Sequence, residues 1–241
     1  MSKANNTIWS PTCERYVGFI DIMGFKDMVL KLSHEEIYEM MKKIDDTKNR
    51  NENISWNKIT DKLVKTTNYS DSIMIYSRDN SYNSLHAFIC TISAMLDDLF
   101  IENIPFKGAI AFGKMTLDTD RSIFFGQPLI DSFLLQEELN FYGVIVHASA
   151  EKEMLQFEDK LGSLFLTKYL CPLKNGASYH LTVHPMTSDK ALQAVEDRED
   201  YESLLIAVHK LRQRTSGYLR RYIDNTEAYI KYVRTNNEDG F

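Results

Sequence analysis

Two short runs of β-favouring residues each contain a single carboxylate among side chains that suit the interior of a sheet. The first run covers residues 16–25 and holds Asp21, and the second covers residues 69–76 and holds Asp71. A buried carboxylate is costly unless it is paired, hydrogen-bonded or bound to a cation. Two such strands side by side would bring both carboxylates to one hard cation, and Gly24 would begin a helix next to Asp21. A cation beside a helix N-terminus is an arrangement that holds a polyphosphate.

Either aspartate taken alone fits a simpler interpretation. A lone aspartate near a strand end is usually a capping or turn residue, and Asp71 also fits a β-bulge or the start of a strand. The pair is harder to explain in this way, because both carboxylates fall on predicted core strands. Oxygen ligands without a neighbouring histidine or cysteine cluster favour Mg²⁺ or Mn²⁺. The sequence therefore predicts a site for one of these cations at Asp21 and Asp71.

The overall composition is typical of a globular protein. The chain has 241 residues, of which 44% are hydrophobic and 12% aromatic, enough for the core of one large domain or of one domain with an appendage. Its formal net charge of -6 argues against a nucleic-acid backbone as the main partner. The same charge is compatible with a single nucleotide, because a bound metal ion reverses the local field.

Cysteine spacing and hydropathy bear on the compartment. Cys13, Cys90 and Cys171 are far apart and odd in number, so we expect reduced packing residues rather than a zinc site or a disulfide framework. The sequence shows neither a charged-then-apolar leader nor an apolar run of membrane-spanning length. We expect a soluble, cytoplasmic protein with no membrane partner.

Hydrophobic periodicity predicts an alternation of strands and helices in the first part of the chain. Residues 45–61 are polar and fit a loop, and Ser33 with Glu36 forms a capping-box signature for a helix. The resulting order β-α-α-β-β-α-β-α-β predicts an α+β, ferredoxin-like palm over residues 15–150. The predicted strands are 16–22, 62–67, 69–76, 105–113 and 142–147, and the predicted helices are 25–32, one beginning after Ser33, 84–100 and 128–139.

The remainder of the chain, residues 151–241, has a different pattern. Asn175 and Gly176 lie between two apolar runs and predict a hairpin over residues 169–183. Residues 189–233 are predominantly helical in pattern. We expect a C-terminal β-hairpin and helical extension that packs on the palm and is not a separate domain.

Four segments resemble motifs of the class III nucleotidyl cyclases, in the order in which that family has them. Together they cover roughly residues 16–147, and the combination is more specific than any one motif. The segments are Phe19 to Phe25 (the first metal motif), Tyr69 to Ser72 (the second metal motif), Gly108 to Gly113 (the glycine-bounded strand) and Phe125 to Asp131 (the start of the last catalytic helix).

The resemblance implies a site and a reaction. Asp21 and Asp71 would hold two Mg²⁺ or Mn²⁺ ions, and the carbonyl of Ile22 would be a further ligand. The backbone N–H groups of the segment from Gly24 through Phe25 to Lys26 would bind the β- and γ-phosphates of a nucleoside triphosphate. The ribose 3′-oxygen would attack the α-phosphorus, and pyrophosphate would leave. Class III sites are shared between two protomers, so the resemblance also implies a homodimer.

The chain departs from the typical family pattern at the transition-state and base-binding positions. The positions of the usual asparagine and arginine hold Ile130 and Leu134. The positions of the purine readers hold Thr67 and Ile123, and Lys65 lies two residues from the usual lysine position. Intact metal motifs with altered readers resemble the pyrimidine nucleotide cyclases of bacterial Pycsar antiphage systems. That resemblance implies cyclic UMP or cyclic CMP as the product, and an effector that the product activates.

Two alternatives stay open, and a third, the palm of a polymerase or diguanylate cyclase, is opposed by the absence of a Gly-Gly-Asp/Glu-Glu-Phe-like hairpin from the sequence. One is a purine cyclase whose base reader has moved, with Lys65 as a candidate for contact with the base. The other is a catalytically inactive cyclase-like module that senses a nucleotide, which the missing asparagine and arginine favour and the retained aspartates oppose. Lys107 precedes Gly108 and could reach a phosphate, but a solvated lysine at a strand end is the favoured interpretation. His147, His180 and His184 fit packing or surface positions.

Overall fold

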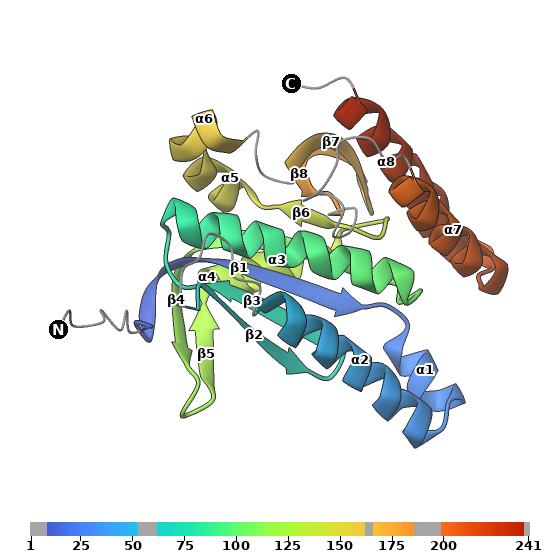
Figure 1. Ribbon diagram of the computed structural model, residues 1–241, viewed down its shortest axis with the longest axis horizontal. Coiled ribbons are helices and arrows are strands. Elements are labelled where there is room, and N and C mark those ends of the chain that lie inside the picture. Colours follow the sequence, from blue (N-terminus) through green and yellow to red (C-terminus); the bar gives the residue numbers. More distant parts are fainter. Residues whose placement is uncertain (1–8, 53–61, 162–165, 186–198, 239–241) are drawn as a thin grey trace.

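A computed structural model describes residues 9–52, 62–161, 166–185 and 199–238. The strands of this part of the chain form one eight-stranded sheet in the order β2-β3-β1-β4-β6-β8-β7, with β5 paired to β4 (Figure 1). The strands are β1 (Thr12–Ile22), β2 (Val64–Tyr69), β3 (Ser72–Ser77), β4 (Phe106–Asp118), β5 (Ile123–Gly126), β6 (Val144–Val146), β7 (Leu166–Leu173) and β8 (Gly176–Val183).

The helices follow the strands in an α+β order. Among the described residues they are α1 (Phe25–Lys31), α2 (His34–Glu52), α3 (Tyr82–Ile101), α4 (Gln127–Glu137), α5 (Ala148–Met154), α6 (Glu158–Leu161), α7 (Glu199–Arg214) and α8 (Arg220–Glu238). The expected α+β palm is therefore confirmed, with β1, β3 and β4 at its centre.

Strand β1 lies between β3 and β4 and pairs antiparallel with both. Because successive side chains of a strand point to opposite faces, Ile20 and Ile22 lie on one face of the sheet and Phe19 and Asp21 on the other. The first face is covered by α3, and we call it the α3 face. The second is covered over β1 and β4 by α4, whose Phe133 ring meets Phe19 edge-on with centroids 5.4 Å apart, and we call it the α4 face.

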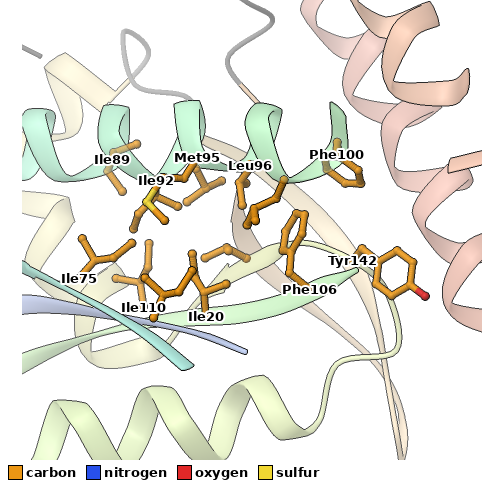
Figure 2. Close-up of a cluster of buried hydrophobic side chains, with 14 of the residues drawn as sticks. Ile20, Ile75, Ile89, Ile92, Met95, Leu96, Phe100, Phe106, Ile110 and Tyr142 are labelled. Carbon is orange, nitrogen blue, oxygen red and sulfur yellow. The ribbon is translucent and has the colours of Figure 1, made fainter. Parts of the chain in front are cut away.

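The α3 face holds the main hydrophobic core. Figure 2 shows side chains of α3 meeting those of β1, β3 and β4 across a gap that they fill. The expectation of no apolar run of membrane-spanning length is wrong for helix α3, which is long and apolar enough to span a bilayer. However, 78% of its most apolar window is buried inside the fold. Its apolar character therefore serves the core of the sheet. The α3 residues in this contact include Ile89, Ile92, Met95, Leu96 and Phe100.

The predicted capping box is present and begins a helix that is longer than expected. The amide of Ser33 donates to Glu36 Oε2 (2.8 Å), and the amide of Glu36 donates to Ser33 Oγ (3.2 Å). The predicted loop over residues 45–61 is wrong for its first part, because α2 continues to Glu52. No glycine or proline interrupts this helix, and polar residues suit its solvent side. Residues 53–61 lie outside the described part of the chain.

The C-terminal part joins the same sheet. The predicted hairpin at Asn175 and Gly176 is confirmed, and its strand β8 pairs with β6. Helices α7 and α8 close this side of the molecule, and the amide of Tyr142 donates to Thr226 Oγ1 of α8 (2.8 Å). The predicted helical region is described from Glu199 onward, and residues 186–198 lie outside the described part.

Candidate active site

The two predicted metal-binding aspartates lie side by side at one end of the central strands. Asp21 is next to last in β1 and its register partner on β3 is Ser72, the residue after Asp71. The amide of Ile22 donates to the carbonyl of Asp71 (2.8 Å), which fixes the two segments to each other. The structure therefore brings together the two carboxylates that the sequence singled out.

Asp71 differs in one respect from the prediction. It lies in the turn between β2 and β3 and is only partly buried, so the expectation of a carboxylate within a core strand is wrong for this residue. The preceding Ser70 has a φ of 53°, in the left-handed region that turns favour. Because Asp71 lies in a turn, its side chain is not packed within the sheet, while its backbone carbonyl accepts the hydrogen bond from Ile22 of β1.

The electrostatics of Asp21 indicate a site crowded with negative charge. Partial burial, the charge of Asp71 and the charge of Glu137 together raise the pKa of Asp21 to about 6, and Lys107 opposes them. A divalent cation would relieve this repulsion, and carboxylate and carbonyl oxygens are the donors that Mg²⁺ and Mn²⁺ prefer. Among the described residues, no three acidic, histidine or cysteine side chains gather into a metal site. The donor set therefore fits cations shared between two carboxylates, the backbone and a bound substrate.

Gly24 turns the chain from β1 into α1. Its φ of 76° and ψ of 10° are left-handed, a conformation that glycine adopts without strain. No side chain caps this helix, so first-turn N–H groups, those of Phe25 and Lys26 among them, have no carbonyl partner within the helix. Gly24 and Lys26 are exposed, and Phe25 is half-buried. The geometry fits the predicted phosphate-binding role of this segment.

Lys107 contradicts the prediction of a solvated strand-end residue. It is directly opposite Asp21 on β4, and only 5% of it is exposed, because α4 packs over it. Its ammonium donates to Glu137 Oε1 at the end of α4 (3.1 Å). Gln136 also donates to Glu137 Oε1 (3.1 Å), and Lys174 lies 3.5 Å from Glu137 Oε2. Sequence reasoning missed this cluster, although a lysine facing the metal-site strand was a usable signal.

The candidate base-contact residue Lys65 is not brought to Asp21 within one chain. Its ammonium lies 4.6 Å from the centre of the Trp9 ring, and its register partner is Tyr76. Tyr76 in turn faces Val17, four positions from Asp21, which is about 13 Å along a strand. A base that contacts Lys65 would therefore lie well away from Asp21 along the sheet.

Helix α4 presents apolar side chains where the cyclase motif has polar ones. It begins after Gly126, where a Cβ atom would lie 2.5 Å from the carbonyl oxygen of Lys114, so only glycine fits. Ile130 is 53% exposed and Leu134 is 57% exposed. Together with Phe133 these residues form one exposed apolar stripe, because positions three and four apart share a helix face.

Two solved structures share this arrangement of strands and helices. One is a bacterial light-regulated adenylyl cyclase. Its alignment covers 84% of this chain and 100% of the cyclase chain, with 12% sequence identity and a TM-score of 0.51. Another is the catalytic core of a rhodopsin-guanylyl cyclase with converted specificity, in complex with ATPalphaS. Its alignment covers 73% of this chain and 99% of the catalytic core, with 10% sequence identity and a TM-score of 0.50. The fold is that of the nucleotidyl cyclases. No protein-family profile and no curated protein matches the sequence.

This cyclase fold confirms the fold that the sequence resemblance implied, and at these identities it establishes the fold alone. The roles of Asp21, Ile22 and Asp71 at metals and of the Gly24–Lys26 segment at phosphates stay predictions. The three histidines have the expected packing roles. His147 caps α5 by accepting from the amide of Ser149, His180 Nδ1 lies 3.1 Å from the carbonyl oxygen of Val146, and His184 is buried.

Proposed function

We propose that this protein is a nucleotidyl cyclase that converts a pyrimidine nucleoside triphosphate, UTP in preference or CTP, into the 3′,5′-cyclic monophosphate and pyrophosphate. The observation that carries the proposal is the pairing of Asp21 with Asp71 at the end of the central strands of a cyclase-fold sheet. The repulsion that raises the pKa of Asp21 fits a place where cations bind.

The geometry suits an in-line displacement at phosphorus. Asp21, Asp71 and the Ile22 carbonyl would hold two Mg²⁺ or Mn²⁺ ions, and the first turn of α1 would bind the β- and γ-phosphates. When bound, the metals lower the pKa of the 3′-hydroxyl and neutralise charge on the leaving group. The 3′-oxygen forms a bond to the α-phosphorus and its proton passes to solvent. The bond from that phosphorus to the bridging oxygen breaks, and pyrophosphate leaves with the electron pair.

Pyrimidine preference is supported by the residues at the purine-reader positions. Thr67 and Ile123 lack the charged or polar groups that would pair with a purine edge, and a site that lacks those partners discriminates poorly in favour of a purine. The resemblance to the pyrimidine cyclases of antiphage systems points the same way and implies a second messenger that activates an effector. The second candidate function is a purine cyclase, since one structural neighbour holds ATPalphaS. A catalytically inactive nucleotide-sensing module is the third.

A cytoplasmic homodimer is part of the proposal. Ile130, Phe133 and Leu134 are exposed and lie on one face of α4. An exposed apolar patch of this kind marks an interaction surface. A second copy would cover it and would bring another protomer to the site. In this proposal, residues 15–150 are the catalytic domain and residues 151–241 are an extension packed on it.

Product identification tests the proposal. The protein is incubated with Mn²⁺ and each of the four ribonucleoside triphosphates, and products are identified by mass spectrometry, with Asp21→Ala as the control. We expect cyclic UMP, with or without cyclic CMP, well above any purine product. Cyclic AMP or cyclic GMP alone would establish the purine alternative, and a wild type that binds nucleotide without forming any cyclic product would establish the sensing module.

A further inference from the structure

A cleft lies between helix α5 and the hairpin of β7 and β8. Strand β6 has three residues and β8 has eight, so within the described sheet β6 pairs with β8 only at Thr182 and Val183. Beyond that point α5 takes the place of a strand, and the amide of Leu181 donates to Glu151 Oε1 (2.9 Å). The cleft has a volume of about 500 Å³, within the range of sites that bind small molecules.

The cleft is separate from the candidate active site. Ala150 and Met154 of α5 pack in the main hydrophobic core, so α5 lies on the α3 face of the sheet. Asp21 points to the α4 face, on the other side of the same sheet. Neither Asp21 nor Asp71 lines the cleft, so a ligand there would leave both proposed metal ligands untouched.

The charged side chains of the cleft favour an anion. Lys152 enters from α5 and Lys168 from β7, and both are exposed. In the part of the chain that the structure describes, neither ammonium group pairs with a carboxylate. Glu151 is the acid among the lining residues, and one of its oxygens already accepts from the amide of Leu181. The cleft therefore offers two ammonium groups to the charged end of a ligand.

An exposed aromatic ring lies next to these lysines. Lys168 is the register partner of Leu181, and Tyr179 is two positions from Leu181 on β8, so the three side chains share one face of the hairpin. The Lys168 ammonium is 5.5 Å from the centre of the Tyr179 ring. That ring is 63% exposed, and Leu155 of α5, which is 61% exposed, adds an apolar wall. An aromatic ring beside a cation is a surface on which a flat ligand ring stacks.

We propose that this cleft is a second, non-catalytic binding site for a small aromatic anion of the nucleoside monophosphate class. The ligand ring stacks on Tyr179, and the phosphate binds to Lys152 and Lys168. This inference goes beyond the proposed cyclase function, because the cleft and Asp21 lie on opposite faces of the sheet.

Titration calorimetry of the full chain with uridine 5′-monophosphate (UMP) tests the proposal, because UMP joins an aromatic ring to a phosphate. EDTA is present so that no metal holds the phosphate at Asp21 and Asp71. Uridine and inorganic phosphate are titrated separately, to measure the two parts of the ligand. Thermal unfolding confirms that each variant folds.

Three variants alter the cleft and two leave it intact. The cleft variants are Lys152→Met, Lys168→Met and Tyr179→Ala. Lys160→Met is the matched control, because the Lys160 ammonium also lies close to a tyrosine ring, 4.7 Å from the centre of Tyr82, and neither residue lines the cleft. Asp71→Ala reports whether UMP binds at the candidate active site.

We expect UMP to bind with a Kd below about 1 mM, as a ligand of this size does in a formed cleft. Each lysine variant should weaken UMP binding about 10-fold, because it removes a charge-assisted contact to the phosphate. Tyr179→Ala should weaken it about 5-fold, because it removes the stacking surface. Uridine and phosphate alone should each bind about 10-fold more weakly than UMP, and Lys160→Met and Asp71→Ala should match wild type.

Three results would overturn the inference. Absence of UMP binding up to about 1 mM would leave the lysines only as protection of the edge strand β7. Binding that Asp71→Ala weakens and the cleft variants do not would place UMP at the candidate active site. Phosphate that binds as tightly as UMP, with Tyr179→Ala matching wild type, would rule out an aromatic ligand. Because the titration contains no metal and needs no turnover, a failed cyclase assay would leave its result unchanged.

Discussion

The α3 face and the α4 face of the sheet differ in how their apolar side chains are covered. On the α3 face, the side chains of β1, β3 and β4 meet a helix whose inward residues are almost all fully buried (Figure 2). On the α4 face, helix α4 covers Phe19 and Lys107 but leaves a stripe of its own apolar residues in solvent. Asp21, one of the proposed metal ligands, lies on this less covered face near the end of β1.

This difference suggests that the α3 face mainly stabilises the fold, whereas the α4 face mainly serves the proposed function. Burial of apolar surface is the main favourable term in folding, and the α3 face supplies most of it. The α4 face holds partly buried charges and exposed apolar groups, which cost stability in a monomer and which a metal, a substrate or a second copy would compensate. Substitutions on the α3 face should therefore lower the free energy of unfolding, whereas substitutions on the α4 face should leave it nearly unchanged or raise it.

The largest effect on stability is expected at Phe88 in α3. This ring is fully buried and lies 6.0 Å from the ring of Tyr16. Phe88→Ala should lower the free energy of unfolding by about 3–5 kcal/mol, because it removes apolar contacts and leaves a cavity. Urea denaturation measures the change. The control is Phe125→Ala on β5, where the ring is 61% exposed and the change should stay within about 0.5 kcal/mol. Equal losses in both variants would contradict the assignment of Phe88 to the main hydrophobic core.

A smaller effect of opposite sign is expected at Asp21. The folded-state pKa of Asp21 is about 6, above its ordinary value of 3.8, so the ionised form destabilises the metal-free protein above pH 6. Asp21→Asn should raise the free energy of unfolding at pH 8 by about 1–2 kcal/mol, after allowance for solvent screening of a half-buried group.

The pH dependence gives this prediction its control. The gain from Asp21→Asn should shrink as the pH falls through 6 and vanish below about 4, where the aspartate is protonated in the folded and unfolded states alike. Denaturation with EDTA at several pH values measures it. A gain that does not change with pH would mean that charge repulsion at Asp21 is not its source.

The smallest effect on folding, together with a large effect on assembly, is expected at Leu134. At concentrations where the wild type is also monomeric, Leu134→Glu should change the free energy of unfolding by no more than about 0.5 kcal/mol, since the side chain is exposed in the monomer. The same change should convert the proposed homodimer into a monomer, as measured by light scattering. Leu155→Glu is the matched control, because Leu155 is 61% exposed and lies outside α4 and β5. A Leu134→Glu dimer of wild-type stability would place the interface elsewhere.

Local sequence patterns predicted much of the fold. The periodic apolar residues of α3, the capping box at Ser33 and the Asn175-Gly176 turn each determine their element through nearby contacts, and all were predictable. The continuation of α2 to Glu52 was not, because polar residues fit both a loop and the solvent side of a helix. Strand β5 was also missed, since a four-residue edge strand has too few residues to show a period.

The candidate site was predictable where it depends on sequence motifs and not where it depends on packing. The two aspartates were identified from their neighbours in the chain. The turn position of Asp71 depends on the left-handed backbone of Ser70, which a run of β-favouring residues conceals. The burial of Lys107 depends on how α4 docks on the sheet, and no local pattern records that contact.

Manganese-dependent release of pyrophosphate by the two aspartate variants tests the central claim most directly. Asp21→Ala and Asp71→Ala are compared with wild type on the preferred nucleotide, with urea denaturation to confirm that each variant folds. Because each carboxylate is proposed to hold both metals, we predict that either substitution abolishes metal-dependent turnover without loss of stability. Full activity in either folded variant would contradict the assignment of this carboxylate pair as the metal site.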